Sequence, residues 1–468
     1  MEVLKIGFII TGMEKFDEIL PAPDVKEDSN AGPPEYFGEL ESFLKNHGDV
    51  IYGGYAGSYK TAMAANALFR KEVIDVLVIH EYTFTQGSTL TALIEGLESV
   101  PFIFWNTQES PAIDANADIG VIFSNNSVCT IPHAGNILFQ RRKDFQVFTG
   151  THNCPKITRR FEDYFTILRA AKHLRKMRIG SIGNQYPGMI TCSVNEASLR
   201  DLIGPSVDHI TMQDTVDAIK NVPETEIDKE VKLIKDTYEI NNLNEEEIRQ
   251  SAKIYLGMKT LLESRDIDAL ADICNLMILE KEIGLAPCYA MTKLADEGMH
   301  SACECDILVA VAIAIANDVA GNAWFTEFYM MDMEKETIFC GHCGYAPSGN
   351  ANPKYPVKAV PTTCYPGALG MGLAFEFIAK PGRAVLLSLV NAPCGYKMIA
   401  TEIDVQDTPP IPANCPQVVF KFRNHEFADG IESFAKSGAS HHMVLVYGDY
   451  AGQFGALADL IGIDFELV

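Results

Sequence analysis

Carboxylates, thiols and an imidazole gather on neighbouring segments in the last third of this chain. Residues 303–306 read Cys-Glu-Cys-Asp, Glu327 follows them, and residues 340–343 read Cys-Gly-His-Cys. The stretch around them is strongly apolar, and a buried carboxylate is costly unless it is paired or bound to a cation. A divalent metal is the simplest partner, and residues 438–442 (Gly-Ala-Ser-His-His) offer a further ligand near the end of the chain.

Each candidate ligand also has an ordinary structural interpretation. Glu304 precedes an apolar helix, where a solvated glutamate is common because the helix dipole favours it. Glu327 is flanked by aromatic residues, which disfavours free solvation, whereas Asp332 nearby has the sequence context of a loop charge. A lone histidine is more often structural, but the carboxylates upstream and the His pair downstream favour His342 as a ligand. We therefore predict Glu304 and Glu327 as ligands, with Asp332 as the alternative second carboxylate.

The His pair near the end of the chain precedes a β-rich apolar run at 443–447. Adjacent residues on a strand point to opposite faces, so at most one of His441 and His442 should reach the site. Oxygen and nitrogen ligands suit Mn²⁺, Mg²⁺, Co²⁺ or Zn²⁺. The alternative is a zinc site built from thiols. The Cys-x-x-Cys spacing is typical of zinc sites, whereas the Cys-x-Cys spacing is a poor match to structural zinc sites. That site would use Cys303, Cys305, Cys340 and Cys343.

The bulk composition narrows the class of protein. The chain has 468 residues, of which 47% are hydrophobic and 21% charged, as in a globular protein of two or three domains. Its 38 basic and 62 acidic residues give a net charge of -24, which argues against nucleic acid or an anionic membrane as a partner. No secretory signal pattern opens the chain, the longest apolar run (307–316) is too short to span a bilayer, and the 12 cysteines are scattered. These features predict a reduced, cytoplasmic setting.

Strand and helix patterns alternate through the first part of the chain, beginning with a strand at 5–11. This βαβ rhythm predicts a parallel sheet covered on both faces, with functional loops at the carboxyl ends of its strands. A second α/β unit has strands at 178–182 and 268–275 and a heavily charged helical stretch at 223–267. After about residue 320, frequent Pro and Gly and β-type alternation predict an antiparallel β domain. The predicted domains are residues 1–165, 166–322 and 323–468.

At the candidate ligands the chain resembles the L-fucose isomerase/L-arabinose isomerase superfamily. The segment 303–306 resembles the first metal carboxylate of that family, and Glu327 before two aromatic residues resembles the second. His342 in Phe-Cys-Gly-His resembles a ligand histidine. Residues 438–442 resemble the family's Gly-Ala-His-His, and the Val-Leu run that follows aligns His442 with the ligand. The metal ligands that this resemblance implies are Glu304, Glu327, His342 and His442.

The resemblance extends to loops of the first domain. Residues 11–14 (Thr-Gly-Met-Glu), 82–84 and 106–108 are similar to three substrate loops of L-arabinose isomerases. His133 resembles a histidine that reaches a neighbouring subunit's site in that family. The chain departs from the family at Glu14, where those enzymes have Gln, and around 86–88, so a divergent member acting on another sugar is expected. The sugar-pocket residues implied are Glu14, Phe84, Gln108 and His133.

The resemblance implies two Rossmann-like or flavodoxin-like α/β domains and a barrel-like C-terminal domain. It also implies a homo-oligomeric aldose–ketose isomerase, a trimer or hexamer, that uses Mn²⁺ or another divalent cation such as Co²⁺ or Mg²⁺. The residues fit this chemistry independently, because moving a sugar carbonyl from C1 to C2 through an enediol(ate) needs an acid and a base, the role expected of Glu304 and Glu327. The alternatives are a non-catalytic sugar-binding or regulatory protein of the same fold, or a zinc protein that uses the Cys cluster.

Overall fold

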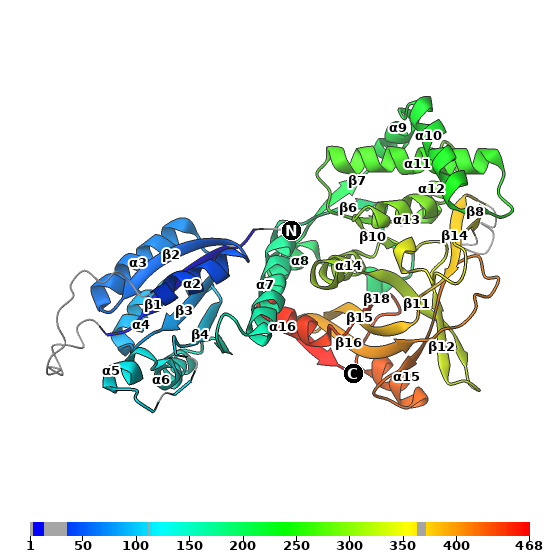
Figure 1. The fold of residues 1–468 in the computed structure, drawn as a ribbon. Helices are drawn as coiled ribbons and strands as arrows, with labels where there is room; N and C mark the ends of the chain where they lie inside the picture. Colours follow the sequence, from blue (N-terminus) through cyan, green and yellow to red (C-terminus); the bar gives the residue numbers. More distant parts are fainter. Residues whose placement is uncertain (1–2, 14–34, 111, 114, 363–370) are drawn as a thin grey trace. The chain divides into compact units, whose positions relative to one another are not determined.

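The computed structural model of this chain describes residues 3–13, 35–110, 112–113, 115–362 and 371–468. The chain divides into two units, Met1–Arg169 and Ala170–Val468, and each has its own sheets (Figure 1). Every helix that is described is too short or too polar to cross a bilayer. The eleven cysteines within the described ranges are free thiols.

A five-stranded parallel sheet forms the first unit. Its strands are β1 (Lys5–Thr11), β2 (Asp49–Ala56), β3 (Val76–Glu81), β4 (Phe102–Asn106) and β5 (Gln146–Thr149). Their order is β2-β1-β3-β4-β5, the flavodoxin-like order, and all neighbours run parallel. The order reverses between β1 and β3, so the loops after these two strands open at the point where α/β sheets bind ligands.

Helices cover both faces of this sheet. They are α2 (Glu35–Lys45), α3 (Tyr59–Glu72), α4 (Gly87–Ile94), α5 (Ile119–Ser124), α6 (Ser127–Gln140) and α7 (Pro155–Lys176). On one face, Phe104 of β4 belongs to a buried cluster with side chains of α3, α4 and α6. On the other, Trp105 contacts Phe43 of α2 and Phe161 of α7, with ring centroids 5.0 and 4.9 Å apart. Neighbouring strand residues therefore serve opposite faces, as the period of a strand requires.

A second parallel sheet opens the second unit. Its strands are β6 (Arg178–Ile182), β7 (Ser206–Ile210), β9 (Ala269–Asp272) and β10 (His300–Cys303), in the order β10-β9-β6-β7. All three strand pairs are parallel. The helical segments are η1 (Ile190–Cys192), α8 (Glu196–Leu202), α9 (Met212–Lys220), α10 (Glu224–Thr237), α11 (Glu245–Ser264), α12 (Cys274–Leu279), α13 (Cys288–Asp296) and α14 (Ile307–Ala320).

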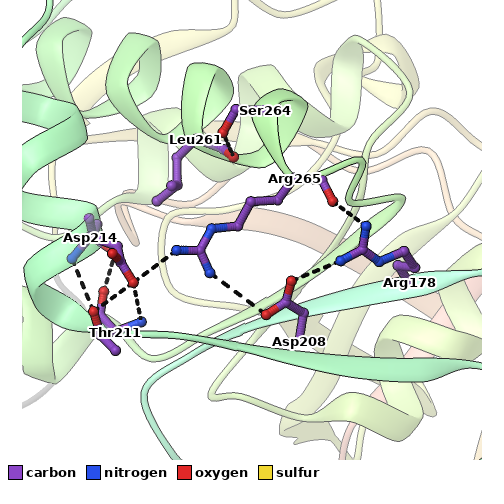
Figure 2. A network of polar contacts seen from close by, with 8 residues as sticks. Arg178, Asp208, Thr211, Asp214, Leu261, Ser264 and Arg265 are labelled. Carbon is purple, nitrogen blue, oxygen red and sulfur yellow. Dashed lines mark hydrogen bonds and ion pairs between the residues drawn. The ribbon is translucent and has the colours of Figure 1, made fainter.

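A network of charges ties the β7 edge of this sheet to its helices (Figure 2). Asp208 in β7 accepts a hydrogen bond from Arg178 at the start of β6 (3.0 Å) and pairs with Arg265 at the end of α11 (3.7 Å). Arg265 also pairs with Asp214 in α9 at 2.9 Å. Asp214 in turn completes a capping box with Thr211 at the start of α9. The network thus connects two strands and two helices around β7.

A closed barrel completes the second unit. Its strands are β11 (Trp324–Asp332), β12 (Thr337–Gly341), β15 (Gly382–Ala392), β16 (Gly395–Val405), β17 (Pro416–Phe422) and β18 (Met443–Tyr447). They run in the order β16-β15-β18-β11-β12-β17, each antiparallel to its neighbour, and β16 pairs again with β17 to close the ring. Closure leaves these strands without a free edge. The remaining elements are β8 (Glu239–Ile240), β13 (Lys358–Pro361), β14 (Leu373–Ile378), β19 (Asp464–Leu467), η2 (Ser348–Asn350), α15 (Phe427–Lys436) and α16 (Ala451–Ile461).

The predicted fold class is confirmed: two parallel α/β sheets precede a barrel of antiparallel strands. Two local expectations are wrong. The helical stretch predicted at 223–267 is interrupted by β8, which pairs with β13, and by Asn242 in a left-handed conformation (φ 59°). The strand predicted at 268–275 ends at Asp272, and α12 begins at Cys274. The domain boundaries at 165 and 322 stay predictions.

Candidate metal centre

Three neighbouring barrel strands bring three candidate ligands to one level. Glu327 in β11 is paired with Gly341, the last residue of β12, and His342 follows directly. Thr326, next to Glu327, is paired with the first residue of β18, which His442 precedes. Since the two registers meet at residues 326–327, the end of β12 and the start of β18 lie on either side of Glu327.

Glu304 comes from a tight turn between β10 and α14. Glu304 and Cys305 both have left-handed backbone angles, with φ of 59° and 56°. Each such residue costs about 1–3 kcal/mol and keeps this conformation only where its surroundings hold it in place. Here the Cys305 N–H donates to the Asp272 carbonyl at the end of β9 (2.9 Å), and the Cys305 thiol lies 3.2 Å from the Ser181 hydroxyl of β6. The parallel sheet therefore anchors the turn that carries Glu304.

Each histidine of the predicted ligand set lies close to a carboxylate of that set. His342 Nε2 is 3.9 Å from Glu304 Oε1 and 4.0 Å from Glu327 Oε1. His442 Nε2 is 3.4 Å from Glu304 Oε2. Around an octahedral ion with ligands at about 2.1 Å, adjacent ligand atoms are about 3.0 Å apart and opposite ones about 4.2 Å. The three observed separations fall between these two values. Among the described residues, however, the four side chains do not share one group of ligand atoms within 4.8 Å: Glu304 groups with His342 and His442, and Glu327 with His441 and His442.

The two nitrogens of His442 face different partners. Its Nδ1 lies 2.9 Å from Asp306 Oδ2 and 3.8 Å from the Cys192 thiol. Its Nε2 makes no hydrogen bond within the described ranges, although the side chain is fully buried. A metal-binding histidine typically donates its second N–H to a carboxylate, which fixes the ring and directs the free nitrogen at the metal. The surroundings of His442 match that arrangement.

Phe325 forms an apolar wall behind both histidines. Its ring centroid lies 4.3 Å from that of His342 and 5.0 Å from that of His442. Phe325 is 1% exposed, and the side chains of both histidines are fully buried. Glu304 and Glu327 keep 18% and 22% of their side-chain surface exposed. The carboxylates thus mark the side of the cluster that solvent or a ligand can reach.

Burial and neighbouring charges set the protonation of these groups. Burial opposes the charge of Glu304, but the ion pair with His442 and the charge of His342 outweigh it and lower the pKa of Glu304. Burial raises the pKa of Glu327 to about 6. Burial also disfavours the charged form of His442, but its contact with Asp306 outweighs this and raises the pKa of His442. A proton therefore occupies His442 in the absence of a cation, and a cation would replace it.

Comparison with known proteins assigns this architecture to a family. The family model for the L-arabinose isomerase central domain matches residues 194–322, and that for its C-terminal domain matches residues 322–464. The chain belongs to the L-arabinose isomerase family. It is a divergent member, because its identity to named relatives is low. Enzymes of this family are aldose–ketose isomerases, a class of intramolecular oxidoreductases, and this chain is a sugar isomerase of that class.

The named relatives cover most of the chain. A protein named sulfoquinovose isomerase from Priestia megaterium is 24% identical over 84% of this chain and 85% of its own length. A second, from Alkalicoccus urumqiensis, is 22% identical over 83% and 85%. A protein named L-arabinose isomerase from Shouchella clausii is 21% identical over 82% and 79%. The similarity thus spans both units and extends beyond the segments that the two family models match.

The structure also shows the positions of the residues that the sequence left as alternatives. His441 is exposed and lies against His442, with ring centroids 4.0 Å apart. Asp332 ends β11 and accepts hydrogen bonds from the backbone N–H groups of Glu334 and Lys335, which close the hairpin. His342 follows β12 rather than lying within it, because the strand ends one residue earlier. Of the two carboxylates, Glu327 is the one that lies near the histidines. His441 and His442 both have a ring nitrogen within 4.8 Å of a Glu327 oxygen, so the assignment of His442 as the ligand stays a prediction.

The thiols of the zinc alternative belong to none of the groups of three or more potential metal ligands found among the described residues. The four groups found there are Glu304, His342 and His442; Glu327, His441 and His442; Cys192, Asp306 and His442; and His173, His300 and Asp318. In the last group, His173 Nδ1 lies 2.6 Å from Asp318 Oδ2 and so pairs α7 with α14. The thiols concerned are Cys303, Cys305, Cys340 and Cys343.

The predicted sugar-pocket residues belong to the first unit of the enzyme. Phe84 follows β3 and its ring lies 5.3 Å from that of His133 in α6. Gln108 follows β4 and donates to the Ser110 carbonyl at 2.6 Å. Phe84 and Gln108 therefore lie in loops at the carboxyl edge of the sheet, where a ligand is expected. Glu14 lies outside the described residues.

Sequence reasoning missed three residues that contact the candidate ligands. Asp306 stood in the first motif without a role, although an Asp before an apolar run is a typical helix N-cap. Phe325 is separated from Glu327 by one residue, and its contacts with both histidine rings are visible only in the three-dimensional structure. Cys192 carried no signal, because its contact with His442 joins segments that are distant in the chain.

Proposed function

We propose that this chain is a metal-dependent aldose–ketose isomerase that works through an enediol(ate), with Glu304 and Glu327 as acid and base. The observation that supports it best is the convergence of two carboxylates and two buried imidazoles, in which three pairs of a histidine nitrogen and a carboxylate oxygen lie 3.4–4.0 Å apart. The metal ligands are Glu304, Glu327, His342 and His442. Mn²⁺ is the cation proposed, with Co²⁺ and Mg²⁺ as the alternatives.

The reaction requires only hydrogen transfers, so no redox partner is consumed. One hydrogen moves from C2 to C1 of the sugar, and one moves from O2 to O1. A divalent cation held by the four ligands would polarise the carbonyl and stabilise charge on the enediolate. Glu327, with its pKa raised by burial to about 6, can take a proton from carbon and return it near neutral pH. Glu304, with its pKa lowered, stays ionised and suits the exchange of the hydroxyl proton.

The substrate is proposed to be an aldose, as the names of the relatives indicate. Relatives named sulfoquinovose isomerase and relatives named L-arabinose isomerase both cover about four fifths of the chain or more. L-arabinose, L-fucose and sulfoquinovose are therefore the first sugars to test. Glu14, Phe84, Gln108 and His133 are proposed to line the sugar pocket, in a homo-oligomer where His133 serves a neighbouring subunit.

The test is isomerisation of this sugar panel by the wild-type chain and by Glu304→Ala and His342→Ala, each supplied with Mn²⁺. We expect ketose formation from at least one sugar and loss of that activity in both variants. Asp332→Asn is the matched control, because that carboxylate lies in the hairpin turn, and its activity should equal that of the wild type. Full activity of either Ala variant, or sugar binding without turnover, would refute the proposal.

A further inference from the structure

Asp306 uses its two carboxylate oxygens for two different contacts. Oδ1 accepts a hydrogen bond from the Val309 N–H (3.1 Å), and so caps the N-terminus of α14. Oδ2 lies 2.9 Å from Nδ1 of His442. Asp306 is 2% exposed, so water does not compete for either contact. One side chain therefore joins the start of a buried helix to a histidine of the barrel.

We propose that Asp306 is a positioning residue for the metal centre: it holds the hydrogen of His442 on Nδ1 and thereby reserves Nε2 for the cation. The proposal deepens the metal site of the proposed function and rests on it. Asp306 is not a ligand in this account, because its oxygens are engaged by His442 and by α14. It acts on the metal only through the imidazole ring.

The chemistry of imidazole explains why a carboxylate is needed. A neutral imidazole has a hydrogen on only one of its two ring nitrogens, and the nitrogen without a hydrogen is the one that binds a metal. A carboxylate can only accept, so the hydrogen next to Asp306 stays on Nδ1 and the lone pair stays on Nε2. The Nε2 atom is the one that lies 3.4 Å from Glu304 Oε2. The tautomer that Asp306 selects is therefore the one that the ligand cluster needs.

The helix cap makes the acceptor rigid. Asp306 cannot rotate toward another partner without releasing the first turn of α14, a helix with eleven buried residues. The ring of Phe325 also packs edge-on against His442 (centroids 5.0 Å apart) and limits its rotation. These two contacts hold the imidazole in place, so His442 does not have to become ordered when the cation binds.

Asparagine at this position separates the two roles. Asn and Asp are equally good N-caps, so Asp306→Asn keeps the contact with the Val309 N–H. Asn has only one acceptor oxygen, and its NH₂ group can only donate. With the oxygen used by the helix, the NH₂ group faces His442 and favours hydrogen on Nε2, the wrong nitrogen for the metal. A residue that acts only as a helix cap would tolerate this change.

The experiment is calorimetric titration of Mn²⁺ into metal-stripped, full-length protein, together with thermal unfolding of the same samples without metal. We expect Asp306→Asn to bind Mn²⁺ about 10- to 100-fold more weakly than the wild type, with unchanged metal-free unfolding. Asp306→Ser, which also retains a cap, should behave in the same way. Asp118→Asn, the same substitution at the cap of α5 in the first unit, should bind like the wild type.

Two results would overturn the proposal. One is wild-type Mn²⁺ affinity in Asp306→Asn, which would leave Asp306 with the helix cap alone. The other is an affinity loss in both variants that only parallels a loss of metal-free stability. Wild-type protein that binds no Mn²⁺ would refute the metal centre itself, and so distinguishes failure of the proposed function from failure of this inference.

Discussion

Glu304 Oε2 and His442 Nε2 lie 3.4 Å apart, although Glu304 follows a strand of the parallel sheet and His442 precedes a strand of the barrel. The contact joins the two sheets of the second unit at their functional ends. All four candidate ligands belong to this unit, Ala170–Val468. The proposed metal ligands therefore come from one compact unit of the chain, and the predicted sugar-pocket residues belong to the other.

Removing the charge of Glu327 should abolish turnover while leaving the fold intact. Glu327→Gln keeps the shape of the side chain but cannot accept a proton from carbon, so we expect kcat to fall by about 10²–10⁴-fold. Steady-state assays on the preferred sugar measure this. Asp332→Asn, at the other end of β11, should change kcat less than twofold, and a comparable loss in that control would contradict the role given to Glu327.

Mn²⁺ affinity should weaken as the pH falls, and more steeply below about pH 6. At every pH in the working range the cation displaces a proton from His442, whose pKa is raised mainly by Asp306 against the effect of burial. Below about 6 it must also displace the proton of Glu327, whose pKa burial raises to that value. For each pH unit by which the pH is lowered, we expect the Mn²⁺ affinity to fall about tenfold above pH 6 and up to about a hundredfold below pH 6. Titration calorimetry from pH 5 to 8 would show a constant affinity if no such protons are released.

Activity should return when two inactive variants share an oligomer. We expect His133→Ala and Glu304→Ala each to lose at least about tenfold in activity, because each lacks one part of the site. If His133 serves a neighbouring subunit, co-expression of the two variants creates some sites that contain both native residues. Separately purified and unmixed variants are the control. Absence of any recovery in verified mixed oligomers would place His133 in the site of its own subunit or outside the site.

Replacing Glu81 should stabilise the protein at alkaline pH. Glu81 ends β3 and is fully buried, and burial raises the pKa of its carboxyl to about 7 against the opposing contacts of Thr130 and Thr85. Because the folded-state pKa lies above that of the unfolded chain, the stability it contributes is complete below about pH 4 and is lost as the pH rises through 7. Glu81→Gln removes this loss, so its unfolding free energy should exceed that of the wild type by up to roughly 3 kcal/mol at pH 8.

Urea unfolding at pH 5 and pH 8 measures that difference. Glu263→Gln, an exposed glutamate on α11, is the control and should leave the pH dependence unchanged. A Glu81→Gln variant that follows the wild-type pH dependence would show that this carboxyl does not carry a raised pKa.

The sequence predicts best the helices and strands whose apolar residues repeat regularly and whose ends carry clear turn or cap residues. The strands at 5–11 and 178–182 match β1 and β6, and the apolar run at 307–316 forms most of α14. Asn244 and Glu247 form a capping box, and this pair in the sequence is a local signal that a new helix begins within the charged stretch. Barrel closure had no local signal, because the pairing of β16 with β17 joins residues far apart in the chain.

The candidate site likewise has a part that the sequence predicts and a part that only the fold reveals. The ligand types were predictable from four motifs in a fixed order, whereas their support was not. Contacts with the sheet hold the left-handed backbone at Glu304 and Cys305. Neither residue type favours this conformation, so the sequence does not predict it. The contact between Asp306 and His442 depends on a parallel sheet and a barrel meeting, so only the three-dimensional structure reveals it.

The most direct test of the metal centre is anomalous diffraction at the manganese edge from crystals of the wild-type protein grown with Mn²⁺. The account predicts one dominant peak within about 2.5 Å of ligand atoms from Glu304, Glu327, His342 and His442. A dominant peak at the His173, His300 and Asp318 cluster, or no peak among the four predicted ligands, would contradict it.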